Sequence, residues 1–125
     1  MNLKQEAEQF LKEKYDMVDF NSYQRSAVTT AIYPAQHKIT YPALGMAGEA
    51  GEVANKVKKL IRDGPEKRPD TWREDIASEI GDVLWYCAAL ADDLNLTLGM
   101  IASQNLAKLQ KRKDKGTIGG SGDNR

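Results

Sequence analysis

Two short acidic segments carry the residue types best suited to chemistry in this chain. Residues 49–52 (EAGE) and 79–82 (EIGD) lie thirty positions apart, and each holds two carboxylates separated by an internal glycine. In a helix, residues three positions apart lie on one face, so each segment would present a pair of acids. Carboxylate oxygens are the ligands that hard cations such as Mg2+ prefer. The pattern predicts a divalent-ion site formed by Glu49, Glu52, Glu79 and Asp82.

Two long helices must position these acids. Pro42 suits a first helical turn and Gly64 suits the position just past a helix, which predicts a helix over residues 42–63. Thr71 and Glu74 form a capping-box pattern at the start of a second helix. That second helix is predicted over residues 72–94.

An antiparallel pairing of these helices would bring the two acidic segments together. The midpoint between Gly51 and Gly81 falls in the connecting turn, so the segments come level to within about one helical turn. A glycine inside a helix costs about 1 kcal/mol relative to alanine. Two such glycines at matching places indicate either a close backbone approach or space for a ligand. The apolar stripes that would pack together are Val53, Val57, Leu60 and Ile61 on one helix and Ile76, Ile80, Val83, Cys87 and Leu90 on the other.

The remaining sequence predicts three further helices and no strand. Apolar residues at helical spacing mark residues 3–15 and 22–32, with Asn21 as the expected N-cap of the latter. Thr97 is expected to cap a last helix that ends near Gly116. We therefore predict an all-α helical bundle of about five helices, whose small core is completed by oligomerisation. The bundle forms a single domain over residues 1–118, followed by a flexible glycine-rich tail, 119–125.

Composition excludes several classes of protein. The 18 basic and 18 acidic residues balance to zero net charge, which gives no reason to expect a nucleic-acid polymer as partner. The single cysteine cannot form an internal disulfide, and the single histidine leaves no His/Cys metal set. No apolar run resembles a signal peptide or a membrane span, so we expect a cytoplasmic protein without a membrane partner.

Three segments resemble the MazG-like nucleoside triphosphate pyrophosphohydrolases. They are residues 48–53 (GEAGEV), 79–86 (EIGDVLWY) and 105–112 (NLAKLQKR), within a likeness that covers about residues 22–115. The family shows Glu-x-x-Glu on one helix, Glu-x-x-Asp on the next, and a C-terminal helix of this third type. The resemblance implies a homodimer or homotetramer with an all-α core. It also implies Mg2+-dependent cleavage of (d)NTP between the α- and β-phosphates, which yields (d)NMP and pyrophosphate.

The chemistry of a triphosphate explains why such a site needs metal. The substrate carries close to four negative charges, so ions must lie between it and the carboxylates. Two or more Mg2+ ions, for which Mn2+ can substitute, would neutralise the phosphates, activate the attacking water and stabilise the leaving pyrophosphate. The sequence leaves open which carboxylate takes the proton, or whether a metal-bound hydroxide does. The alternative reading of the four acids is a solvated helix face.

Five further residues are candidates for substrate binding. Lys56 lies one turn past Glu52, where it would hold a phosphate or pair with that acid. Tyr86 would donate a hydrogen bond to the sugar or a phosphate, or pack in the core. Asn105, Lys108 and Arg112 share one helix face. By resemblance this face reaches the triphosphate; otherwise it is a solvated basic helix end that complements the helix dipole.

Base recognition rests on aromatic and amide side chains alone, and two other functions compete with the enzyme. A preference for deoxynucleotides, with dGTP as first candidate, follows only from the resemblance. A di-iron bundle would require Glu-x-x-His pairs, which the sequence lacks. A non-catalytic helical oligomerisation or interaction module is the alternative function, although it leaves the paired glycines unexplained. Candidates to contact the base are Trp72, Trp85, Tyr23, Tyr33, Tyr41, Gln24 and Gln36.

Overall fold

The computed structural model describes residues 2–15 and 18–125 of the chain. Within these residues the chain forms five α-helices, three short 3-10 turns and no strand, which confirms the all-α prediction. The 3-10 turns are Val28–Thr30, Ala35–His37 and Pro65–Lys67. The α-helices are α1 (Leu3–Tyr15), α2 (Phe20–Ala27), α3 (Thr40–Asp63), α4 (Trp72–Asp93) and α5 (Leu98–Asp114).

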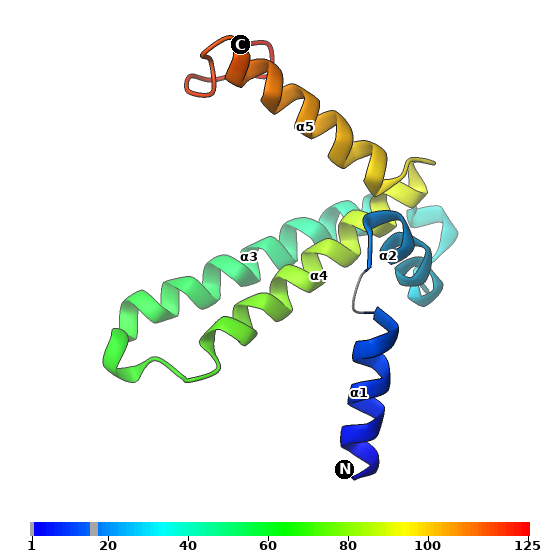
Figure 1. The fold of residues 1–125 in the computed structure, drawn as a ribbon, viewed down its shortest axis with the longest axis vertical. Coiled ribbons are helices and arrows are strands. Elements are labelled where there is room, and N and C mark those ends of the chain that lie inside the picture. Colours follow the sequence, from blue (N-terminus) through cyan, green and yellow to red (C-terminus); the bar gives the residue numbers. More distant parts are fainter. Residues whose placement is uncertain (1, 16–17) are drawn as a thin grey trace.

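Helices α3 and α4 form the antiparallel hairpin that the sequence predicted, and they lie side by side along their length (Figure 1). Helix α3 begins at Thr40, two residues before the expected start, and the side chain of Pro42 is buried in its first turn. Gly64 ends α3 with a φ of +80°, a conformation that side chains other than glycine rarely adopt. The hairpin turn therefore begins at Gly64, as the sequence predicted.

The predicted N-cap of α2 was wrong. Asp19 caps this helix, since its carboxylate accepts a hydrogen bond from the Ser22 amide at 2.7 Å. Asn21 lies inside the helix instead, and its side chain accepts a hydrogen bond from the Gly99 amide at 2.9 Å. The α-helix ends at Ala27 and continues only as a 3-10 turn to Thr30, so it stops short of the expected Ile32.

One of the two other predicted caps forms. Thr97 accepts a hydrogen bond from the Met100 amide at 3.2 Å and caps α5 as expected. The capping box of Thr71 and Glu74 does not form, because the Thr71 hydroxyl donates to the Asp75 carboxylate at 3.0 Å. A free threonine hydroxyl can choose between a backbone and a side-chain partner, and the sequence pattern does not settle that choice.

The core is small and sits where α2 crosses α4 and the start of α5. Its buried apolar residues are mostly alanines, which permit close helix packing, and Gln24 is buried beside them. The Gln24 side chain donates to the Leu96 carbonyl at 2.9 Å and accepts from the Leu98 amide at 2.7 Å. It therefore holds the α4–α5 corner, which contradicts the suggestion that it reads a base. The core comprises Ala27, Ala88, Ala91 and Leu98, with Tyr23, Leu84, Trp85 and Cys87 packed against it.

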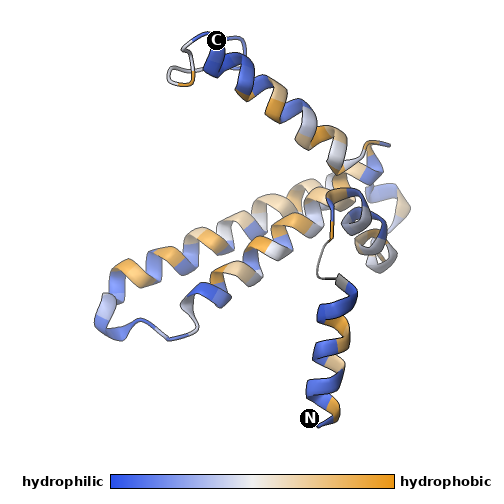
Figure 2. Cartoon of the chain, viewed as in Figure 1, coloured by the Kyte–Doolittle hydropathy of each residue, from blue (hydrophilic) through white to orange (hydrophobic). Residues whose placement is uncertain are grey.

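Much apolar surface stays uncovered in the single chain. Helices α1 and α5 extend away from the hairpin, and hydrophobic residues recur along all the long helices (Figures 1 and 2). The chain exposes 9574 Å², whereas a globular monomer of 13.9 kDa exposes about 6,700 Å². Three members of the predicted stripes, Val57, Ile61 and Ile80, are exposed. Among the described residues, each helix is too short or too polar to span a bilayer.

Candidate metal and substrate site

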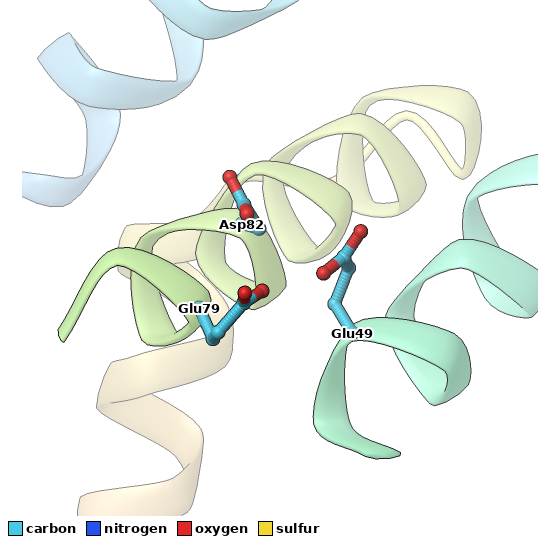
Figure 3. Close-up of side chains that lie close together, drawn as sticks. All are labelled: Glu49, Glu79 and Asp82. Carbon is cyan, nitrogen blue, oxygen red and sulfur yellow. The ribbon is translucent and has the colours of Figure 1, made fainter. Parts of the chain in front are cut away.

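Three of the four predicted acids meet between α3 and α4. Glu49 extends from α3 toward Glu79 and Asp82 of α4 (Figure 3). One carboxylate oxygen from each residue lies within 4.8 Å of the others. Glu49 and Glu79 are half-buried, whereas Asp82 is exposed. Helix pairing thus converts two sequence motifs, far apart in the chain, into one cluster of oxygen ligands.

Electrostatics within the cluster favour a bound cation. The hydrogen bond with Glu79, followed by desolvation and the charge of Asp82, raises the pKa of Glu49. A hydrogen bond from Lys56 is the main cause that lowers the pKa of Glu79. Glu49, which has no cation beside it in the described part of the chain, therefore holds a proton more tightly than an isolated carboxyl, which is the expected response to uncompensated negative charge. A hard divalent ion would relieve this repulsion, and the all-oxygen ligand set fits Mg2+.

The perturbed pKa of Glu49 predicts a pH-dependent stability in the metal-free protein. A carboxyl whose folded-state pKa is raised stabilises the fold below its ordinary value of 4.5. That contribution is lost as the pH rises through the folded-state pKa. Glu79 acts oppositely, because its lowered pKa adds stability that is complete above 4.5. We expect the thermal midpoint in EDTA to fall above that pH, and the fall to be smaller in Glu49→Gln. Equal slopes in the two proteins would contradict this electrostatic picture.

Glu52 lies outside the cluster. It is exposed one turn further along α3. The helical spacing correctly predicted that Glu52 lies about one turn from Glu49, yet the Glu52 carboxylate does not join the other three. Its charge is the smallest of the effects that raise the pKa of Glu49. A role for Glu52 as a ligand therefore needs its side chain to turn toward the cluster.

Lys56 pairs with a different acid from the one expected. Its ammonium lies 3.2 Å from Glu79 of α4, rather than pairing with Glu52 of its own helix. The ion pair links the two helices, and its Glu79 side is largely buried. This contact keeps the Glu79 carboxylate ionised and directs it toward the cluster.

The helices α3 and α4 do not approach each other closely at the paired glycines Gly51 and Gly81. A Cβ atom added at Gly51 or Gly81 would meet nothing within 4 Å, so space above both helices stays open. The close approach occurs at Gly45, where an added Cβ would overlap the Tyr86 ring. Sequence reasoning missed Gly45, since nothing in its spacing connects it with Tyr86. Room for a ligand or a partner is the surviving explanation for Gly51 and Gly81.

Alanine substitutions at Gly45 and Gly51 should distinguish a glycine needed for close packing from one that faces open space. Gly45→Ala is expected to lower the free energy of unfolding by about 1–3 kcal/mol, because the methyl group displaces the Tyr86 ring. Gly51→Ala is expected to raise it by about 0.5–1 kcal/mol through helix propensity alone. Urea denaturation of the two variants measures both effects. A loss of stability in Gly51→Ala would reveal a contact at that position that the single chain does not contain.

Aromatic rings adjoin the acidic cluster. Tyr86 lies half-buried with its ring centroid 6.3 Å from Tyr41 and 5.0 Å from Trp85. Desolvation chiefly raises the pKa of Tyr86, and the charges of Glu49 and Asp82 add to the shift. Tyr86 therefore packs against α3, which is one of its two predicted roles, and its hydrogen bond to the sugar or a phosphate stays a prediction.

A carboxylate that sequence reasoning missed fixes the loop before α3. Asp93 accepts hydrogen bonds from the Tyr33 hydroxyl at 2.8 Å and from the Ile39 amide at 2.9 Å. Desolvation and the Asp93 hydrogen bond raise the pKa of Tyr33 to about 12. Tyr33 in turn stacks on Tyr41, with ring centroids 4.7 Å apart. Asp93 thus anchors Tyr33, which contacts Tyr86 through Tyr41.

The α5 residues do not approach the acidic cluster within one chain. Helix α5 leads away from the α3–α4 hairpin (Figure 1). Lys108 and Arg112 instead form ion pairs with Asp123 of the C-terminal tail, at 3.2 and 3.0 Å. Asn105 is exposed on the same helix. The predicted contact of this face with the triphosphate therefore requires a second chain or a large movement.

Other candidates for base contact have defined neighbours. The Trp85 indole donates a hydrogen bond to the Thr30 hydroxyl at 2.8 Å, at the edge of the core. The guanidinium groups of Arg68 and Arg73 lie over the Trp72 ring near the hairpin turn, 4.8 and 5.3 Å from its centroid. These contacts give Trp85 a packing role, whereas Trp72 stays partly exposed.

Comparison with known proteins assigns the family. The family profile described as "MazG nucleotide pyrophosphohydrolase domain" matches residues 37–117, which is more than half of the chain. The chain belongs to this family. The MazG match spans α3, α4 and α5, and it includes the acidic cluster and the basic α5 face. Helices α1 and α2 lie outside the matched MazG region.

A relative extends the comparison beyond the MazG domain. The Gene 37 protein of Mycobacterium phage L5 is 48% identical over 109 residues, which cover 82% of this chain and 96% of that protein. No solved structure matched this MazG chain significantly. The family assignment therefore rests on sequence, and the arrangement of the candidate site rests on the structure described here.

Proposed function

We propose that this chain is a Mg2+-dependent nucleoside triphosphate pyrophosphohydrolase. It cleaves (d)NTP between the α- and β-phosphates and releases (d)NMP and pyrophosphate. The observation that carries this proposal is the convergence of Glu49, Glu79 and Asp82 from two helices of a MazG-family chain. Deoxynucleotides are the proposed substrates, with dGTP first among them.

The cluster is suited to two or more ions. Glu49, Glu79 and Asp82 would hold them, and Glu52 would join by a change of side-chain rotamer. When bound, Mg2+ or Mn2+ supplies charge neutralisation for the phosphates and a lower pKa for the attacking water. The chain contributes the position of the ligands, because α3 and α4 fix three carboxylates before any ion arrives.

Different environments give the two glutamates different roles. Glu79 is held ionised by Lys56, which suits a permanent metal ligand. Among the described residues, Glu49 faces Glu79 and Asp82 without a lysine partner, and it is our candidate to accept the proton of the attacking water at Oε. Tyr86 lies near Glu49 and Asp82 and is our candidate to donate a hydrogen bond to the sugar or a phosphate.

A homodimer or homotetramer would complete the site. The single chain exposes roughly 2,900 Å² more than a globular monomer of its mass, while a standard stable interface buries about 800 Å² per partner. The basic face of α5 also lies away from the acidic cluster of its own chain. We propose that α5 of one protomer reaches the acidic cluster of another, so that both faces contact a single triphosphate.

Product analysis tests this function. The protein is incubated with each of the canonical ribo- and deoxyribonucleoside triphosphates and Mg2+, and the products are resolved by phosphorus NMR. Monophosphate plus pyrophosphate is expected, with the highest turnover on deoxynucleotides. Diphosphate plus orthophosphate would contradict the cleavage position. No turnover of any nucleotide would instead favour the helical interaction module.

A further inference from the structure

The C-terminal tail, which was expected to be flexible, folds back onto α5 in the structure. The Asp123 carboxylate lies 3.2 Å from Lys108 and 3.0 Å from Arg112, two of the predicted substrate ligands. Arg112 also donates to the Asp123 carbonyl at 3.2 Å, and its side chain is only 8% exposed. The Asp123 side chain is 81% exposed. The tail thus places an exposed carboxylate on a buried guanidinium.

The tail has a defined shape because it binds itself. The Arg125 guanidinium donates to the carbonyls of Thr117 at 3.2 Å and Ile118 at 3.3 Å, and also to that of Gly122. Gly120 and Gly122 have φ angles of +89° and +85°, which glycine adopts readily. These turns and hydrogen bonds close the tail into a loop that presents Asp123 to α5.

A cavity of about 360 Å³ lies between this loop and the last turns of α5. Five cationic side chains line it, against one carboxylate. The Nε atom of Arg112 is buried there and has no hydrogen-bond partner among the described residues. Buried donors normally have partners, so this atom indicates an acceptor that the folded-back tail does not supply. The charged lining residues are Lys108, Lys111, Arg112, Lys115, Asp123 and Arg125.

The proposed function already assigns this α5 face to the triphosphate. We propose in addition that Asp123 occupies the cavity as an internal anion until the pyrophosphate part of the substrate displaces it. The inference rests on the proposed function, which supplies the ligand. A phosphate group carries more charge than a carboxylate and pairs with a guanidinium in a bidentate manner. The Asp123 carboxylate is exposed, so its ion pairs contribute little free energy and substrate can break them. Five cations around one carboxylate exceed what a purely structural contact requires.

Binding of inorganic pyrophosphate without metal tests the site directly. In EDTA the acidic cluster repels this anion, so amide shifts in an NMR titration should appear at Gly119, Gly120 and Gly122. Asp123→Asn is expected to bind pyrophosphate about fivefold more tightly, because the internal competitor is weakened. Asp114→Asn is the matched control, since it removes the same charge at the end of α5. Within the part of the chain that the structure describes, the Asp114 side chain accepts a hydrogen bond from Gln110 at 2.9 Å and is not part of the cavity. An equal gain in the two variants, or shifts confined to α3 and α4, would overturn the inference.

Steady-state kinetics separates this inference from the proposed function. Asp123→Asn is expected to lower KM for the triphosphate about fivefold with kcat unchanged. If every variant lacks turnover, the proposed function fails, and the pyrophosphate titration still decides whether the cavity binds the anion. If turnover is intact and KM is the same in Asp123→Asn as in the unmodified protein, the tail inference alone is overturned.

Discussion

Glu49→Gln is expected to lower kcat for triphosphate hydrolysis by about a thousandfold, the scale of a lost general base. The variant also loses one oxygen ligand of the cluster. Asp82→Asn should act in the same direction. Helical content should persist in both proteins, because neither side chain lies in the buried core. Initial rates of pyrophosphate release and far-ultraviolet circular dichroism measure the two effects.

A matched control lies on α4, the helix that carries Asp82. Glu74→Gln removes one negative charge from the first turn of α4, outside the acidic cluster. It should leave turnover nearly unchanged, because Glu74 is exposed. Near-normal turnover in Glu49→Gln would exclude Glu49 from both proposed roles. A comparable loss in Glu74→Gln would show instead that the overall charge of α4 matters.

Mixing two inactive variants is expected to restore turnover. Lys108→Glu reverses a charge on α5, and the Lys108 side chain is 43% exposed, so the fold should tolerate the change. If α5 of one protomer serves the acidic cluster of another, a dimer of Glu49→Gln with Lys108→Glu contains one intact site. Random exchange between symmetric dimers would then give about a quarter of the unmodified turnover.

The control for this experiment combines two lesions on the same side of the site. Glu49→Gln mixed with Asp82→Asn leaves every acidic cluster damaged, so no exchange of subunits can repair it. Turnover should stay at the level of the separate variants. Recovery in this control, or none in the first mixture despite subunit exchange, would contradict a site shared between protomers.

The long helices could be predicted because their apolar residues recur at helical spacing. This spacing, together with Gly64, predicted the α3–α4 hairpin, and the hairpin brings Glu49 close to Glu79. Helix caps were less predictable. Asp19 and Asn21 are both good N-caps two residues apart, and the contact of Asn21 with the distant Gly99 amide decides between them.

Contacts between distant segments left no sequence signal. Gly45 and Gly51 are both glycines inside the same helix, so the sequence does not distinguish them. Only the packing of α3 against α4 shows that Gly45 faces Tyr86. Asp123 lies in a glycine-rich tail without periodicity, so its pairing with Arg112 was not foreseeable. Glu52 shares a helix face with Glu49, yet mutual repulsion of carboxylates gives it no reason to join the cluster without a cation.

Diffraction at the manganese edge tests the central claim most directly. Crystals would be grown with Mn2+ and a triphosphate analogue that cannot be cleaved between the α- and β-phosphates. We expect anomalous peaks between α3 and α4, about 2.1 Å from oxygens of Glu49, Glu79 and Asp82. Peaks elsewhere, with these three side chains directed apart into solvent, would contradict the account.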